Sequence, residues 1–215
     1  MPNSRAPFVT YDSTLLEDVS VGAASRAAWT SIRVASVLFV TALTAAAAQL
    51  SMHLPFTPVP LTLQPTVVLL GAAALGPRLG AASQALYLLL GIAGLPVFAA
   101  SPILPQGIAR LAGPTGGYLL AYPVAAFITG SLAARGYDRR YVTSLLGMLA
   151  GLATIFAGGV LWLAYFASLP SQPPIGLQAA LAAGLYPFVL PDLMKVYLAS
   201  PILPSVWKLR TGTKN

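Results

Sequence analysis

Asp192 and Lys195 lie three positions apart in the apolar stretch YPFVLPDLMKVYLAS. On a helix this spacing puts both side chains on one face, where a carboxylate and an ammonium group can pair. A charge at the centre of a bilayer costs about 2.5 to 3.5 kcal/mol even on the mildest scale, so the two residues must pair or line a polar cavity. We therefore expect a ligand site here. The alternative is a structural pair that fixes this helix to its neighbours.

Gln84 and Tyr87 form a second polar pair, again three positions apart, in GAASQALYLLLGIAGLPVFAA. The amide of Gln84 has two N–H donors and a carbonyl that hydrocarbon cannot satisfy, so it must face protein or a ligand. A hydrogen bond to another helix explains this residue as well as a ligand contact does.

The segment QGIARLAGPTGGYL contains one cation and a glycine turn. Arg110 could attract an anionic solute, although a solvated loop arginine is the plainer explanation. Gly116 and Gly117 precede a predicted helix start, where backbone N–H groups can bind an anion. A tight turn explains the two glycines equally well.

Few residue types in this chain support catalysis. The 215 residues include no cysteine, five acids and one histidine, His53. A P-loop, a Gly-x-Ser-x-Gly motif and a paired-histidine motif are all missing from the sequence. We therefore expect no catalytic residue, metal site or cofactor, and no ATP hydrolysis through a P-loop in this chain.

The composition indicates an all-α membrane protein. Charged residues make up 8% of the chain and hydrophobic residues 57%, with a mean hydropathy of +0.77. Soluble domains average about 25% charged residues, so a soluble enzyme is excluded. The net charge of +7 would otherwise suggest nucleic acid, but the basic residues are scattered between apolar runs.

Six apolar segments approach the roughly 20 residues that cross about 30 Å of hydrocarbon. The predicted spans are 33–53, 61–76, 79–100, 116–134, 141–169 and 176–207. The second is short for a full crossing. In the sixth, Pro187, Pro191 and Pro201 predict a kinked or interrupted helix. A transmembrane domain over 31–208 with tails at 1–30 and 209–215 follows.

The basic residues predict the orientation in the membrane. Of the 12 lysines and arginines, Lys195 lies inside a span and Arg110 lies on one side, which leaves ten on the other side. Because basic residues concentrate in cytoplasmic loops, both termini are expected in the cytoplasm.

Two further segments are expected to make contacts outside the polar pairs. The outer connection HLPFTPVPLTLQ is rich in proline, which restricts the backbone and prevents a helix. We expect a semi-rigid lid that includes Phe56, Pro58 and Pro60. In TALTAAAAQL, Ala42 and Ala46 form a strip of small residues that lets another helix approach, whether from this chain or from another subunit.

Four motifs in order resemble the BioY family of biotin transporters: PFTPVPLTLQ, LGPRLGAASQALYLLLGIAGLPVF, GPTGGYLLAYPVAAF and PFVLPDLMKVYLA. The resemblance covers nearly all of residues 35–205. It implies a six-helix substrate-binding subunit (S component) of an energy-coupling-factor (ECF) transporter in a bacterial plasma membrane. In that family the S component captures biotin from outside, and a transmembrane coupling subunit with two ATPases drives its release inward. Ala42 and Ala46 would then dock on the coupling subunit.

The chemistry of biotin fits the polar residues. Its ureido ring has two N–H donors and one carbonyl, which match the carboxylate of Asp192 and a donor from Lys195 or Gln84. Its fused apolar rings need walls, and the candidates are Tyr87, Phe98 and Tyr186. Its valerate carboxylate needs a cation or N–H groups, and the candidates are Arg110, Gly116 and Gly117.

Three other functions remain open at this point. In a self-sufficient secondary transporter of biotin or a similar small carboxylate, the Asp192 and Lys195 pair would relay protons, and an uncoupler would abolish accumulation. An intramembrane acyl or prenyl transferase is disfavoured by the shortage of acids and histidine. A structural scaffold would bind no small molecule at all.

Overall fold

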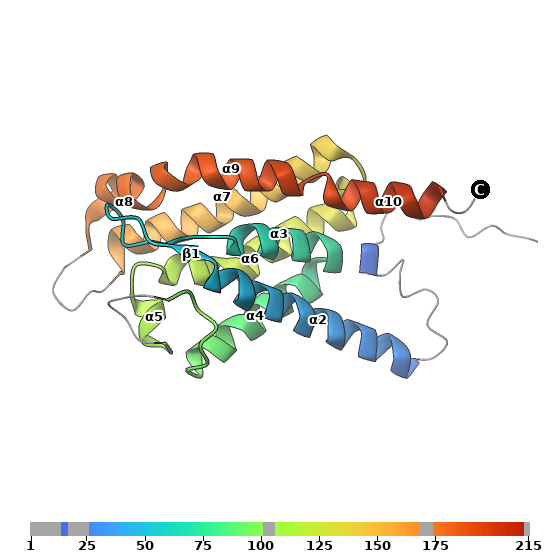
Figure 1. Ribbon diagram of the computed structural model, residues 1–215, viewed down its shortest axis with the longest axis horizontal. Helices are drawn as coiled ribbons and strands as arrows, with labels where there is room; N and C mark the ends of the chain where they lie inside the picture. The colour runs from blue at the N-terminus through green and yellow to red at the C-terminus, as the bar shows by residue number, and fades with distance from the viewer. Residues whose placement is uncertain (1–13, 17–25, 101–105, 168–173, 213–215) are drawn as a thin grey trace, which may run out of the picture.

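The computed structural model describes residues 14–16, 26–100, 106–167 and 174–212, and it is a bundle of helices whose long axes run roughly side by side (Figure 1). The all-α prediction is therefore confirmed. In chain order, the helices are α2 (Arg26–Gln49), α3 (Gln64–Leu75), α4 (Pro77–Ile92), α5 (Ala109–Ala112), α6 (Gly116–Ala134), the 3-10 turn η1 (Tyr137–Arg139), α7 (Tyr141–Tyr165), α8 (Gly176–Gly184), α9 (Tyr186–Ala199) and α10 (Ile202–Gly212). Two short strands, β1 (Ser51–Met52) and β2 (Leu61–Thr62), form an antiparallel pair.

Helix α6 lies at the centre of the bundle, with α7 on one side and α3 and α4 on the other. Small residues let α6 and α7 approach closely. A Cβ built on Gly158 would lie 2.8 Å from the Cβ of Ala121, and one built on Gly117 would overlap the side chain of Trp162. Such close contacts replace the hydrophobic driving force that is missing between helices in lipid.

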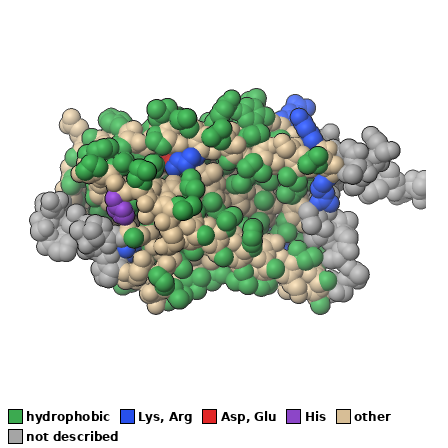
Figure 2. Space-filling view, viewed as in Figure 1, with side chains coloured by type: hydrophobic (Ala, Val, Ile, Leu, Met, Phe, Trp, Pro, Cys, Tyr) green, Lys and Arg blue, Asp and Glu red, His purple; other side chains and the backbone are tan. Residues whose placement is uncertain are grey.

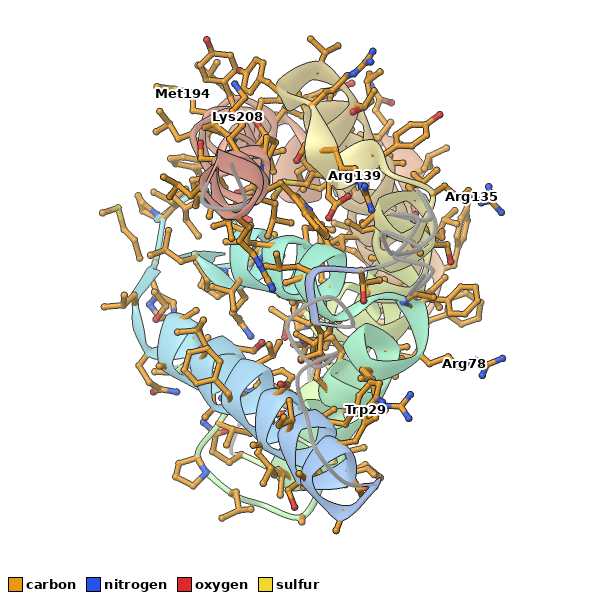
Figure 3. The ribbon with its side chains drawn as sticks, turned by 90° about the vertical axis from the view of Figure 1, so that its right-hand side faces the viewer. Trp29, Arg78, Arg135, Arg139, Met194 and Lys208 are labelled. Carbon is orange, nitrogen blue, oxygen red and sulfur yellow. The ribbon has the colours of Figure 1, made fainter. Side chains whose placement is uncertain are left out.

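The two ends of the bundle differ in chemistry. The β1–β2 hairpin, α5 and α8 lie together at one end, which we call the hairpin end (Figure 1). The opposite end, the basic end, carries Arg78, Arg135, Arg139 and Lys208 (Figure 3). Hydrophobic side chains cover much of the long face between the two ends (Figure 2). This distribution suits a chain whose sides face lipid.

Fewer helices than predicted reach the full length of a span. Among the described residues, Ala27–Gln49, Gly116–Ala134 and Tyr141–Tyr165 are long and apolar enough to cross a membrane. A fourth crossing results if α8 and the helices that follow it count as one bent span. Six crossings therefore stay a prediction, because α3 and α4 have only 12 and 16 residues.

The boundaries of the shorter helices differ from the prediction for local reasons. The predicted span 79–100 is helical only to Ile92, because Gly94 adopts a φ of 94° and Pro96 follows it. The predicted span 61–76 is helical only from Gln64, since Leu61 pairs with Met52 in the hairpin. A residue in the left-handed backbone conformation ends a helix, and glycine adopts this conformation without strain.

The predicted interruption of the last apolar segment is confirmed. Helix α8 and the helical stretch from Tyr186 to Arg210 meet at a bend of 41°. Pro187 occupies the first turn of α9, where its missing N–H leaves no hydrogen bond unmade. Pro191 lies inside α9 without ending it, and Ser200 and Pro201 separate α9 from α10.

At the basic end, side chains from distant segments fix α10 to the bundle. The indole Nε1–H of Trp207 donates to Oδ2 of Asp138 at 2.6 Å, and the Arg139 guanidinium lies 4.5 Å from the centre of the indole ring. Burial raises the pKa of the Asp138 carboxyl, while Trp207 and Arg139 lower it. Leu15, from the N-terminal tail, packs beside Leu203 at the same end.

Replacing Trp207 with phenylalanine is expected to destabilise the fold by about 1 to 3 kcal/mol, because Asp138 is 1% exposed and would lose its indole donor. Thermal unfolding in detergent measures the loss. Trp29→Phe is the matched control, since that ring contacts the Arg33 guanidinium and is only half-buried. Equal destabilisation by the two substitutions would contradict a specific role for the Asp138 bond.

Candidate functional site

A cavity that is partly open to the outside lies at the hairpin end of the bundle. Side chains of several elements meet there, because the hairpin, α3, the segment after α4, α5, α6, α7 and α9 all contribute lining residues. The lining residues are Val59, Pro60, Leu61, Thr62, Gln64, Pro65, Phe98, Ala99, Arg110, Thr115, Tyr118, Leu119, Tyr122, Ile155, Phe156, Phe188 and Asp192.

Asp192 provides the carboxylate of the cavity. It lies on α9, is 4% exposed and forms an ion pair with Lys195. Lys195 does not belong to the lining, and its Nζ donates to the backbone carbonyl of Thr62 at 2.7 Å. The predicted pairing of Asp192 with Lys195 is therefore present, with only the acid facing the cavity.

Arg110 lines the same cavity from α5 and is 4% exposed. Its Nε is buried and has no hydrogen-bond partner among the described residues. Burial lowers the pKa of this guanidinium, which still stays protonated because an arginine loses its proton only at very high pH. A buried cation with an open donor is stabilised by an anion, and a carboxylate is the anion that a guanidinium binds best in planar geometry.

Aromatic side chains form a wall of the cavity. Tyr87 is fully buried behind this wall, with its ring edge-on to Phe98 at 5.5 Å and 6.4 Å from the ring of Tyr122. Its hydroxyl accepts a hydrogen bond from Nε2 of Gln64 at 2.6 Å and donates to the carbonyl of Val97 at 3.1 Å. Tyr87 thus supports the lining residues Gln64 and Phe98 and does not line the cavity itself.

A glycine determines where Phe98 packs. A Cβ built on Gly91 would overlap the Phe98 ring. This close approach lets the irregular segment after α4 fold back against the helix. Tyr118 also belongs to this wall, and its hydroxyl donates to the carbonyl of Gly184 at 2.6 Å.

Gln84 lies away from the cavity. Its Nε2 donates to Oγ1 of Thr44 at 3.3 Å and to Oγ of Ser83 at 3.2 Å. Thr41 adds a bond to the carbonyl of Ser83 at 2.9 Å, so these polar groups join α4 to α2. Of the two explanations that the sequence left open, this geometry favours the contact between helices.

Three further predicted site residues are also outside the lining. Tyr186 begins α9 and is 65% exposed. Gly116 and Gly117 are packing positions, because a Cβ on Gly116 would overlap the carbonyl of Leu111 and one on Gly117 would overlap Trp162. The nearby residues Thr115 and Tyr118 line the cavity in their place.

Trp162 links the helix of Arg110 to the bundle. Its indole Nε1–H donates to the carbonyl of Gly113, directly after α5, at 3.1 Å. Its ring also stacks on Phe166 with centroids 5.6 Å apart. The position of the Arg110 segment is thereby tied to α7.

Several residues that line the cavity were not among those predicted from the sequence. Gln64 is a polar residue in an apolar helix, so the criterion that selected Gln84 would also have selected it. Tyr118 and Tyr122 lie four apart, which places them on one helical face. Thr115, Phe156 and Phe188 carry no sequence signal of their own.

The proline-rich connection covers one side of the cavity. Ser51 pairs with Thr62 and Met52 with Leu61, and the loop between them brings Val59 and Pro60 into the lining. Phe56, at 66% exposed, and Pro58 face outward.

The small-residue strip is accessible on α2. Ala42 and Ala46 are both exposed, beside Phe39 at 66% exposed and Leu43 at 43%. An exposed strip of alanines between large apolar residues lets another helix approach the backbone.

Comparison with known proteins gives a consistent result. The sequence profile of the BioY family matches residues 22–212. A probable biotin transporter BioY of Pyrococcus horikoshii is 42% identical over 166 residues, which are 77% of this chain and 90% of that protein. The biotin transporter BioY of Thermotoga maritima is 38% identical over 158 residues, 74% of this chain and 86% of that protein.

One solved structure matches the fold. It is a crystal structure described as the S-component for biotin from an ECF-type ABC transporter. The TM-score is 0.71 at 26% identity, and the match covers 83% of this chain and 92% of that one.

Proposed function

The chain belongs to the BioY family, and from this premise we propose that it is the biotin-binding S component of an ECF-type importer. It captures biotin from the outer side and performs no chemistry on it. We place it in a bacterial plasma membrane with six crossings, both termini in the cytoplasm and the hairpin end outside. Ten of the 12 lysines and arginines lie on the side that is predicted to be cytoplasmic, which supports this orientation.

One observation carries the proposal: a buried carboxylate and a buried guanidinium line one apolar cavity. The two ureido N–H groups of biotin donate to Asp192, and its valerate carboxylate pairs with Arg110. The fused rings lie between Phe98, Tyr122 and Phe188. Biotin therefore supplies a partner to each of the two charged residues, Asp192 and Arg110, in the described lining of the cavity.

The other predicted contacts take indirect roles in this proposal. Tyr87 positions Gln64 and Phe98, while Gln84 joins two helices. Tyr186, Gly116 and Gly117 make no direct contact with biotin.

Gln84→Leu is expected to leave the Kd for biotin within about twofold of the parent value, because its amide bonds to Thr44 and Ser83 rather than facing the cavity. Gln64→Leu is the matched substitution, since Gln64 lines the cavity and bonds to Tyr87. Losing one neutral hydrogen bond costs about 0.5 to 1.5 kcal/mol, which is roughly 2- to 13-fold in affinity. Equilibrium binding of labelled biotin compares the two, and a larger loss in Gln84→Leu would contradict the assignment.

Uptake needs partners that this chain does not contain. We propose that a transmembrane coupling subunit docks on the Ala42 and Ala46 strip and that two ATPase subunits complete the importer. The exposure of both alanines on α2 supports this docking surface.

Thermal unfolding of the detergent-purified chain tests the proposed function. A ligand at 100 times its Kd stabilises the folded state by about 2.7 kcal/mol. Biotin is expected to raise the unfolding temperature clearly. Biotin amide should raise the unfolding temperature less, because it lacks the negative charge that Arg110 binds. Desthiobiotin is a second comparison ligand, which keeps both the ureido group and the carboxylate. A folded, unloaded chain that shows no shift with biotin would refute the proposal.

A further inference from the structure

The segment that carries Arg110 depends on other elements for its position. Helix α5 is a single turn of four residues, and its hydrogen bonds are local. The Arg110 N–H donates to the Gly107 carbonyl at 3.1 Å, and the Gly113 N–H donates to the Arg110 carbonyl at 3.3 Å. An isolated turn is unfavourable, because it fixes several backbone dihedral angles for each hydrogen bond that it gains.

Two side-chain hydrogen bonds connect this segment to other parts of the described chain. Nε2 of Gln106 donates to the carbonyl of Phe98 at 3.1 Å, but Phe98 lies in the irregular segment after α4. The indole Nε1–H of Trp162 donates to the carbonyl of Gly113 at 3.1 Å, and Trp162 lies on α7, a continuous helix of 25 residues. Of the two bonds, the one from Trp162 therefore fixes the segment to a long helix of the bundle.

Close packing fixes the indole of Trp162 in turn. A Cβ built on Gly116 would lie 2.9 Å from its Nε1, and one built on Gly117 would overlap its Cβ. The ring also stacks on Phe166 with an interplanar angle of 29°. The donor for Gly113 is thus held by the backbone at the start of α6 and by a ring on its own helix.

The guanidinium of Arg110 depends on where this segment lies. The residue is 4% exposed, and its Nε has no hydrogen-bond partner among the described residues. Because no described acceptor holds Nε, the neighbouring backbone determines the position of the cation in the cavity. A hydrogen-bonded pair of a guanidinium and a carboxylate needs good alignment, so a displaced backbone weakens it. Trp162 does not line the cavity and can act on the ligand only through this segment.

We propose that Trp162 is a positioning residue that holds Arg110 against the carboxylate of the ligand. It thereby sets the preference of the cavity for a charged acid over the uncharged amide. The inference rests on the proposed function, because it takes biotin as the ligand and Arg110 as the partner of its carboxylate. Without the indole donor, α5 shifts and the carboxylate end of the ligand loses its contact. The ureido end, at Asp192 on α9, keeps its own.

Trp162→Phe removes the donor and keeps an aromatic ring that can stack on Phe166. The Kd for biotin is expected to rise about 3- to 10-fold, as for the loss of one hydrogen bond. The Kd for biotin amide should stay within about twofold of the parent value, so that the preference for the acid narrows. Calorimetry on the detergent-purified full chain measures both affinities. Trp162→Tyr also lacks the indole N–H and replaces Trp162→Phe if that variant does not fold.

The Arg110→Met background shows whether Trp162 acts through Arg110. Where the cation is already missing, Trp162→Phe should change the Kd for biotin by less than about twofold. A full additional loss in the double variant would overturn the proposal. Equal losses for biotin and its amide in Trp162→Phe would overturn it as well, since both results indicate support of the cavity as a whole. An unchanged Kd for biotin in Trp162→Phe has the same consequence.

Phe166→Leu is the matched control on α7. It removes the ring that stacks on Trp162 but leaves the indole donor in place, and Phe166 is 62% exposed. Both affinities should stay within about twofold of the parent values. A preference that narrows as much as in Trp162→Phe would assign the effect to packing and refute the role of the hydrogen bond.

Failure of the proposed function gives a different result. The parent chain would then bind neither ligand, and biotin would not raise its unfolding temperature. A parent chain that binds biotin and its amide equally well would leave biotin binding intact and overturn the positioning role alone.

Discussion

Replacing Asp192 with asparagine is expected to weaken biotin binding between several-fold and about 1000-fold. A hydrogen bond to a charged group contributes about 1.5 to 3 kcal/mol, and asparagine keeps the shape of the side chain without the charge. The substitution also leaves Lys195 without its ion pair, and loss of one partner of a buried pair is itself destabilising. Equilibrium binding of labelled biotin measures the change.

Met194→Leu is the matched control for Asp192→Asn. Met194 lies two positions away on α9, is 57% exposed and is outside the lining. The Met194→Leu substitution should leave the Kd for biotin unchanged. Parent-like affinity in a folded Asp192→Asn variant would remove Asp192 from the site.

Arg110→Met is the second substitution with a large expected effect. Methionine fills much of the volume of the arginine stem and removes the cation. Affinity for biotin should fall about 10- to 150-fold, the equivalent of about 1.5 to 3 kcal/mol. Affinity for biotin amide should change little, because that ligand has no carboxylate for Arg110 to bind.

Comparing the two ligands separates binding from folding. Calorimetry on the parent and the Arg110→Met variant with each ligand gives four affinities and one coupling free energy. Equal losses for biotin and its amide would show that Arg110 supports the cavity without binding the carboxylate. The Asp192→Asn variant should lose affinity for both ligands, since both keep the ureido ring.

Charged residues of the site could be predicted from the sequence because charge in an apolar chain is expensive. Asp192 is an acid among apolar neighbours, and Arg110 is predicted to lie on the side of the membrane opposite to ten of the other basic residues. Both line the cavity. Their binding roles stay predictions.

The glutamines could not be sorted in the same way. Gln64 and Gln84 each lie in a helix that is apolar around most of its circumference, so no polar face indicates which side meets the cavity. Their contacts in the fold tell them apart, because Gln84 bonds to Thr44 on α2 whereas Gln64 bonds to Tyr87 beside the cavity.

The fold was predictable where apolar segments are long and uninterrupted. The span 116–134 coincides with α6, and α7 starts at the predicted Tyr141, while residues 168–169 of that span lie outside the described residues. The predicted tails, too, fall largely outside them. Prediction failed after Ile92, since the hydropathy of 93–100 remains high although the chain turns at Gly94.

The Nε of Arg110, which has no hydrogen-bond partner among the described residues, also bears on the lifetime of the protein in a cell. A buried charge that awaits its counter-ion makes the empty chain the less stable form, and ligand binding removes that penalty. Proteases and chaperones act on the unfolded fraction, so differences of about 1 to 2 kcal/mol change abundance several-fold. Under the proposed function, we therefore expect the amount of this chain in the membrane to follow the supply of its ligand.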